Sequence, residues 1–213
     1  MAAPTTAQAM PRALVVACGA LGRELVALKE ATGWEALEIT CLPAIWHNHP
    51  EKIAPGLRRK LKAADGYDAV FVAYGDCGTG GEVDAVIEEF GVERIAGPHC
   101  YQFFMGTDDF TRMTDDDPAR FFLTDYLVRH FDRLIVKGLG LDRFPELRDM
   151  YFGNYTALVY IAQTEDERLK AKAQQAAERL GLAFEYRYCG YGELQTFIEE
   201  ARGGRIEEAR NGH

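Results

Sequence analysis

The chain has 213 residues, of which 47% are hydrophobic and 27% charged, and its formal net charge is −9. This length is enough to bury one sizeable core, so we expect a single domain. The acidic balance and the lack of a dense Lys/Arg cluster argue against a nucleic-acid-binding protein. The nearest approach to a basic cluster, Arg58-Arg59-Lys60, lies within a helical pattern and is expected to form a solvated face.

No apolar segment approaches the length of about 18 residues that spans a membrane. Residues 1–10 lack the apolar core of a signal peptide. We therefore expect a cytoplasmic protein without a membrane segment, with a disordered start over residues 1–11 and a loose tail over residues 203–213. The five cysteines are odd in number and widely spaced, which favours reduced thiols, metal ligands or catalytic cysteines over disulfides.

Apolar, β-branched runs alternate with amphipathic runs along the chain. Strands are predicted over residues 13–18, 37–42, 67–73, 92–96, 155–162 and 183–188. Helices are predicted over residues 21–31, 51–64, 82–90, 165–180 and 193–201. This alternation predicts an α/β protein, a three-layer sandwich with a mostly parallel sheet of about six strands.

Residues 107–153 interrupt the alternation with aromatic and acidic residues and no clear strand. A turn and helix start is predicted at residues 115–118, a long helix over 121–137 and a short helix over 144–152, with a strand at 134–136 as the weaker alternative. We expect an α-helical insertion that covers the sheet, inside a single domain of residues 12–202. The aromatic residues around it are expected to be core, although a flat apolar ligand could use the same surface: Tyr101, Phe103, Phe104, Phe121, Phe122 and Tyr126.

Three cysteines fall at the predicted carboxyl ends of strands. Cys18 and Cys77 each stand in a C-G-x-x-G turn, and Cys100 follows a Gly-Pro turn. Ligands of parallel sheets bind outside these strand ends. Thiolates are both soft metal ligands and nucleophiles, so the three could hold zinc or three corners of an iron–sulfur cluster. The spacing lacks the C-x-x-C pattern of common structural zinc sites, and simple burial as small core residues is the alternative.

His47, His49 and His99 are the candidate imidazoles nearest to these cysteines, and His99 adjoins Cys100. Either His47 or His99 could supply a fourth metal ligand, and His47 could instead carry protons near neutral pH. For His47 a solvated or helix-capping role is an equal alternative, and for His49 and His130 it is the favoured one. Of the two cysteines that remain, Cys41 is expected in the core and the role of Cys189 stays open.

The glycine-rich turns could bind an anion at helix N-termini. They have neither the Walker lysine nor the G-x-G-x-x-G spacing, and close helix–strand approach explains the glycines equally well. The candidate cofactor-binding glycines are Gly19, Gly78, Gly80 and Gly81. Asp76 and Glu24 are candidate acids near the same sheet edge, with a turn-forming aspartate and a surface glutamate as the alternatives.

Several motifs together resemble a known family. They are L-P-A-x-x-H-N-x-P-x-x-I at residues 42–53, Y-G-D-C-G-T-G-G at 74–81, G-P-H-C-Y at 97–101, L-T-D at 123–125, G-L-G-L-D at 138–142 and F-G-N-Y at 152–155. The pattern is similar to a bacterial and archaeal family classed as a domain of unknown function, over about residues 12–200. Cys18, Cys77, Cys100 and His47 match the family's pattern, whereas His49 falls at a variable position.

The resemblance implies a functional setting without naming a reaction. Members of the family accompany corrinoid-dependent methyltransferases, small corrinoid proteins and corrinoid-reactivation proteins, and are linked to split cobalamin-dependent methionine synthesis. An accessory or catalytic role in corrinoid one-carbon transfer is therefore implied, such as methionine synthesis or methylamine-type demethylation. The corrinoid would come through a partner: a corrinoid protein, a methyltransferase or a reactivation protein.

The leading hypothesis is a metalloprotein of such a system. Cys18, Cys77 and Cys100 bind zinc, or alternatively an iron–sulfur cluster, with His47 or His99 as fourth ligand and with Asp76 and His47 as catalytic candidates. One alternative is a non-catalytic partner that docks on a corrinoid protein through its acidic charge and aromatic insertion. Another is a small-molecule enzyme with Cys77 or Cys100 as nucleophile and a histidine as base.

Overall fold

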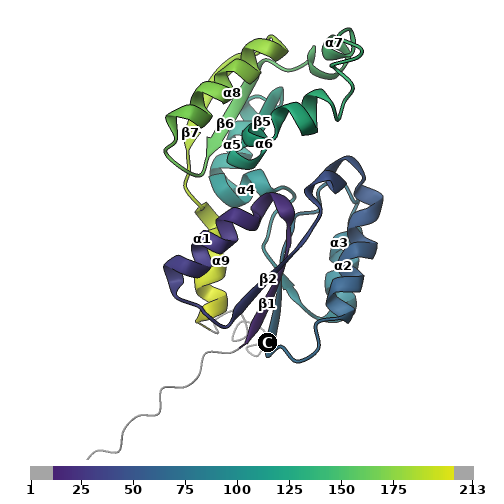
Figure 1. Cartoon of the computed structure of the whole chain (residues 1–213), viewed down its shortest axis with the longest axis vertical. Coiled ribbons are helices and arrows are strands. Elements are labelled where there is room, and N and C mark those ends of the chain that lie inside the picture. Colours follow the sequence, from purple (N-terminus) through teal and green to yellow (C-terminus); the bar gives the residue numbers. More distant parts are fainter. Residues whose placement is uncertain (1–11, 204–213) are drawn as a thin grey trace, which may run out of the picture.

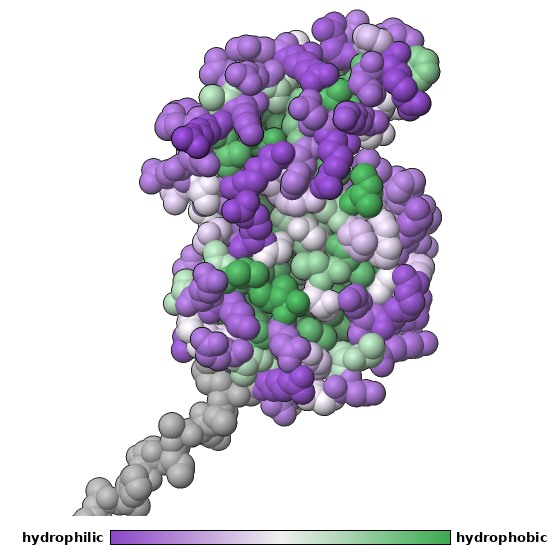
Figure 2. All heavy atoms as spheres, in the orientation of Figure 1, coloured by the Kyte–Doolittle hydropathy of each residue, from purple (hydrophilic) through white to green (hydrophobic). Residues whose placement is uncertain are grey.

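The computed structural model describes residues 12–203, which form two lobes joined at a waist (Figures 1 and 2). Seven strands make two sheets, one of four strands and one of three, and every pairing in both sheets is parallel. The strands are β1 (Ala13–Cys18), β2 (Leu37–Leu42), β3 (Ala69–Ala73), β4 (Glu93–Arg94), β5 (Arg120–Thr124), β6 (Ala157–Ala162) and β7 (Ala183–Tyr188). The predicted α/β class with parallel strands is confirmed.

Helices and helical turns connect the strands. The α-helices are α1 (Gly22–Thr32), α2 (Ile53–Lys62), α3 (Glu82–Phe90), α4 (Cys100–Met105), α5 (Thr107–Asp116), α6 (Asp125–Arg129), α7 (Leu147–Phe152), α8 (Glu167–Leu180) and α9 (Gly192–Arg202). Three 3₁₀ turns, η1 (Gly19–Leu21), η2 (Ala44–Asn48) and η3 (Pro50–Lys52), follow β1 and β2, and a π-helical turn, η4 (Asp132–Val136), follows α6.

The first lobe is built on the sheet β2-β1-β3-β4. All six residues of β1 are buried, as expected for a continuous apolar strand between two helical layers. Helices α1 and α9 pack together on one side of this sheet, and α2 and α3 pack together on the other (Figure 1). The chain runs from β1 outward to β2 on one side of the sheet and from β3 outward to β4 on the other side. The strand order therefore reverses between β1 and β3. In open parallel sheets, that reversal is where ligands bind.

The second lobe is built on the sheet β5-β6-β7. Side chains of β5 and β6 alternate between the two faces, so Phe122 and Val159 join the core of the first lobe while Leu123 and Leu158 join a second core. Helix α8 contributes Leu169 and neighbouring alanines to that second core. The two lobes therefore share packing through α4, which contacts α9 as well as β5 and β6.

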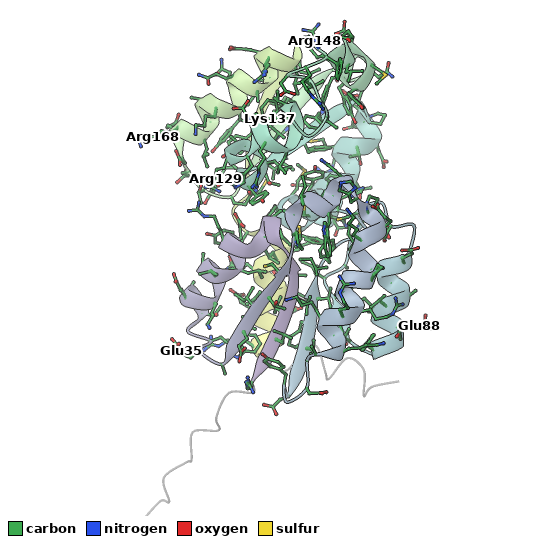
Figure 3. The ribbon with its side chains drawn as sticks, turned by 45° about the vertical axis from the view of Figure 1, so that its right-hand side comes forward. Glu35, Glu88, Arg129, Lys137, Arg148 and Arg168 are labelled. Atoms are coloured by element: carbon green, nitrogen blue, oxygen red, sulfur yellow. The ribbon has the colours of Figure 1, made fainter. Side chains whose placement is uncertain are left out.

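The carboxyl ends of the two sheets face each other across the waist. Turn η1, which follows β1, contacts α6, which follows β5. Figure 3 shows Arg129 of α6 at this junction, on the lower edge of the second lobe. The strand ends of both lobes thus border one region.

Three expectations differ from the structure. The strands form two sheets where one sheet of about six was expected. Segment 107–153, expected to be helical, contains the strand β5. The long helix predicted over 121–137 is therefore wrong, because this range holds the end of β5, the short helix α6 and the π-helical turn η4. Thr124 ends the strand and caps α6 by accepting a hydrogen bond from the Leu127 N–H, at 3.4 Å. The helix start predicted near Asp115 is wrong as well, because α5 ends there.

The predicted disordered start, residues 1–11, lies outside the described residues, as does all of the predicted loose tail beyond residue 203. Between residues 12 and 203, no helix combines the length and the apolar character that crossing a bilayer requires.

Candidate metal centre

Cys18 ends β1 at the reversal of strand order. Its side chain is 2% exposed, and its sulfur accepts a hydrogen bond from the backbone N–H of Ala20 at 3.3 Å. The chain turns sharply here, because Gly19 passes so close to β2 that an added Cβ would lie 3.0 Å from the carbonyl oxygen of Leu42. Gly19 is thus explained by close packing of two strand ends.

The loop after β3 presents Cys77 in a strained backbone conformation. Among residues 12–203, Cys77 is the only non-glycine residue with a positive φ, at 49°. Its N–H donates to the carbonyl oxygen of Pro98 at 3.1 Å, and a Cβ on Gly75 would lie 2.6 Å from the same oxygen. The loop is therefore fastened to the Gly97-Pro98 turn, and the strain at Cys77 is held by its surroundings, a pattern found at functional sites.

Asp76 and the glycines of this loop serve the turn itself. The Asp76 carboxylate accepts hydrogen bonds from the Thr79 hydroxyl at 2.6 Å and from the N–H groups of Gly81 and Gly80 at 2.8 and 3.2 Å. These donors lower the pKa of Asp76, the Thr79 hydroxyl most of all. Gly78, Gly80 and Gly81 all have positive φ. The N–H groups of Gly80 and Gly81 are therefore engaged by Asp76 and turned away from any anion.

His47 lies in turn η2, after β2. Its Nδ1 lies 2.9 Å from the carbonyl oxygen of Ala44 and 3.7 Å from the sulfur of Cys18. Since a carbonyl oxygen only accepts, Nδ1 carries a hydrogen, and in the neutral form of the ring, which is the form that binds metals, the lone pair is on Nε2. A backbone carbonyl that holds the N–H of the non-coordinating nitrogen is the usual support of a metal-binding histidine.

Three sulfurs influence the imidazole of His47, and that of Cys18 lies 3.7 Å from its Nδ1. Burial lowers its pKa, but hydrogen-bonding contacts with Cys100, Cys18 and Cys77 outweigh burial and raise the pKa far above its ordinary value. His99 also acts on Cys77, whose pKa it lowers. The structure thus brings together Cys18, Cys77, Cys100 and His47, with His99 at the border; we call these five side chains the cysteine–histidine cluster.

The cysteines of the cluster differ in their pKa. Burial raises the pKa of Cys77, but the contacts with His47 and His99 prevail and bring it to about 7. Burial raises the pKa of Cys100, which His47 only partly opposes. Cys77 is therefore the thiol of this pair that most readily becomes a thiolate, the form that binds metals and attacks electrophiles.

Tyr74 packs against the His47 side of the cysteine–histidine cluster. Its ring stacks on His47 with a centroid distance of 6.3 Å and an interplanar angle of 18°. The residue is fully buried, yet its hydroxyl has no hydrogen-bond partner among the described residues. Burial and the nearby Cys18 sulfur raise the pKa of this hydroxyl, so it remains a donor. A buried unpaired donor is costly and rare, and no sequence pattern predicts it.

The donor set suits a metal ion, although the side chains as they stand do not enclose one. Among the described residues, no group of three or more histidine, cysteine, aspartate or glutamate side chains is arranged around a point that an ion could occupy. The ring of His47 nevertheless lies beside the Cys18 sulfur, 3.7 Å from Nδ1, the nitrogen that also lies 2.9 Å from the Ala44 carbonyl oxygen.

An apolar cavity of about 130 Å³ adjoins the cluster and shares Cys100 and His47 with it. Its walls come from both lobes. They are Ala20, Ala44, Asn48 and Tyr101 from the first lobe and α4, and Phe121, Thr124, Tyr126, Leu127, Leu134 and Ile135 from the second. We call it the waist cavity. The sequence offered only the aromatic residues as a hint of it.

The other candidates lie apart from the cluster. All five cysteines are free. Cys41 packs beside α1, where burial raises its pKa, and Cys189 lines a separate polar groove with Arg187. Glu24 is not a surface glutamate but is 5% exposed, and burial raises its pKa. His49 sits 3.5 Å from Glu51 on the surface.

A family model of proteins of unknown function, DUF1638, matches residues 41–198. The chain belongs to the DUF1638 family. The match includes His47, Cys77 and Cys100 but begins after Cys18. None of the curated proteins matches this DUF1638 protein. Among solved structures, ornithine carbamoyltransferase from Pyrococcus furiosus is similar at 15% identity and a TM-score of 0.25, over 84% of this chain and 55% of that one. This chain thus spans about half the length of that enzyme.

Proposed function

We propose that this DUF1638 protein is a thiolate metalloprotein in which Cys18, Cys77 and Cys100 hold a zinc ion and His47 is the fourth ligand. One observation carries the proposal: His47, on the loop after β2, lies 3.7 Å from the Cys18 sulfur and lines one cavity with Cys100. Interactions with Cys100, Cys18 and Cys77 also raise its pKa. His99, the rival fourth ligand, interacts with Cys77. Zinc accepts sulfur and nitrogen donors in such a four-coordinate set.

The residues around the ion would each have a defined task. Ala44 holds the Nδ1 hydrogen of His47, which leaves Nε2 for the metal. The Ala20 N–H supports the Cys18 sulfur, and the unpaired Tyr74 hydroxyl can donate to a metal-bound sulfur. A substrate thiol would bind such a zinc ion as a fifth ligand or in place of His47, and the ion would keep that thiol deprotonated and thus nucleophilic at neutral pH. A cytoplasmic location, where thiols stay reduced, suits this chemistry.

Metal analysis of anaerobically purified protein tests the proposal. We expect about one zinc per chain in the wild type and in Cys41→Ser, and loss of zinc in Cys77→Ser. His47→Ala should weaken zinc binding, whereas His49→Ala should not. A wild-type protein that carries no metal and takes up neither zinc nor iron would refute the proposal. Visible absorption between 350 and 450 nm together with bound iron would favour an iron–sulfur cluster over zinc.

We further propose that the site serves corrinoid-dependent methyl transfer, on the strength of the motif resemblance alone. The partner would be a corrinoid protein, a methyltransferase or a corrinoid-reactivation protein. Adding the zinc-loaded protein to methylcobalamin and a thiol tests this role. Faster loss of the methylcobalamin absorbance than with Cys77→Ser protein supports it, and equal rates count against it.

A second candidate function is nucleophilic catalysis by Cys77. The pKa of about 7 and the contacts with two histidines favour it. Metal-free protein would then consume an electrophilic substrate through Cys77, and added zinc would inhibit the reaction. If zinc binding is tight and the protein is always isolated with the metal, this second candidate fails.

A further inference from the structure

The waist cavity is built to exclude charge. None of its lining residues is a lysine, arginine, aspartate or glutamate. Its polar groups are the His47 ring, the Asn48 amide and a few hydroxyls, and the Thr124 hydroxyl is already engaged as the cap of α6. A charged group placed against Leu127, Leu134 and Ile135 loses its hydration and gains no ionic partner, which costs several kcal/mol. The lining therefore favours an uncharged occupant.

The size of the waist cavity limits the occupant. Its volume is about 130 Å³. An apolar protein cavity of about 150 Å³ accepts benzene, a molecule of six carbon atoms. The waist cavity thus suits a compound of about five or six heavy atoms and is too small for a nucleotide or a corrinoid ring.

The cavity has a reactive end and an apolar end. Cys100 and His47 form the first. Leu127 of α6 and Leu134 and Ile135 of the π-helical turn η4 form the second. Single π-helical turns are rare and occur frequently at functional sites. An occupant with one sulfur and a short carbon chain would place the sulfur at the cluster and the chain against the second lobe.

We propose that the substrate of the cysteine–histidine cluster is a small uncharged thiol or methylthio compound with a short aliphatic chain, bound in the waist cavity, and not a free amino acid or carboxylate. The assignment of a sulfur head group rests on the proposed zinc function, whereas the assignment of an uncharged chain rests on the lining of the cavity alone. The occupant lies between the two lobes, so its binding also stabilises their contact across the waist.

Two thiols of equal chain length, one neutral and one with a carboxylate, test whether the waist cavity excludes charged compounds. Binding of 1-propanethiol and of 3-mercaptopropionate to the zinc-loaded protein is measured by calorimetry. We expect 1-propanethiol to bind at least tenfold more tightly. Ile135→Trp, which fills the apolar end, should weaken 1-propanethiol binding at least tenfold, whereas Val26→Trp on the exposed face of α1 should leave it unchanged. Equal or tighter binding of 3-mercaptopropionate overturns the inference, as does an Ile135→Trp protein that binds like the wild type.

Benzene, which has no sulfur, separates failure of the cavity from failure of the metal site. We expect benzene to shift the NMR signals of the Leu127 and Ile135 methyl groups in metal-free wild-type protein. In Ile135→Trp protein, the Leu127 signals should not shift. The Val26 signals of the wild type are the control and should not shift either. Absence of these shifts overturns the inference even if zinc binds. Their presence in a protein that never binds zinc supports the cavity assignment while the proposed zinc function fails. Retained folding of Ile135→Trp is checked by circular dichroism.

Discussion

Cys77 gives the most discriminating mutation in the molecule, because its backbone conformation reverses an ordinary rule. At most positions, replacing alanine by glycine costs about 0.5–1 kcal/mol, since glycine gains freedom in the unfolded chain. At Cys77, φ is 49°, and the left-handed conformation costs a residue with a Cβ roughly 1–2 kcal/mol that glycine does not incur. We therefore expect Cys77→Gly to be more stable than Cys77→Ala by about 0.5–1 kcal/mol.

The assay is urea unfolding of metal-free, reduced protein, followed by circular dichroism. The same pair at Cys41, which lies in β2 with extended backbone, is the matched control, and there alanine should be the more stable by about 0.5–1 kcal/mol. Both replacements at position 77 should abolish zinc binding. If Cys77→Ala equals or exceeds Cys77→Gly in stability, the strain assigned to this loop does not exist.

Three further predictions concern the framework. Glu24→Gln should stabilise the protein at pH 7, because burial raises the pKa of Glu24. The wild type therefore loses stability as the pH rises from the ordinary glutamate range through the raised pKa. Unfolding curves of the two proteins should show that the stability gained by the variant vanishes at acid pH. Asp76→Ala should cost about 1–2 kcal/mol of unfolding free energy, because three donors lose their acceptor; no change would contradict the turn role. Gly192→Ala should cost more than about 2 kcal/mol, since its Cβ would overlap the Phe104 carbonyl oxygen, against roughly 1 kcal/mol for Gly181→Ala, which has positive φ but open space; similar melting temperatures for the two variants would count against that overlap.

The position of Cys18 and Cys77 at one edge of the sheet was predictable, because it follows from the geometry of parallel strands. Parallel strands place their carboxyl ends at one edge, so Cys18 and Cys77 meet once residues 13–18 and 67–73 are recognised as neighbouring strands. The structure adds that the strand order reverses between these two strands. Their role as metal ligands stays a prediction.

The division into two lobes was not predictable from local patterns. Strand β5 has the aromatic composition of a strand, but the apolar residues that follow it continue the pattern into a helix, and only Thr124 followed by Asp125 marks the boundary. Which sheet a strand joins depends on long-range pairing, here with β6. The free hydroxyl of Tyr74 likewise results from packing, since the sequence shows only an apolar aromatic residue at a strand end.

The return of the chain to the first lobe has a consequence for how the protein is made. Helix α9 supplies Leu194, Phe197 and Ile198 to the core of the first lobe, beside α1 and α4. During synthesis, residues 18 to 100 leave the ribosome long before α9 does, and the second lobe is complete before the first. The cysteine-bearing loops therefore wait, unsupported on one side, until about residue 201 has emerged. If the proposed zinc site exists, ion uptake should accordingly be a late event, which follows the docking of the last helix.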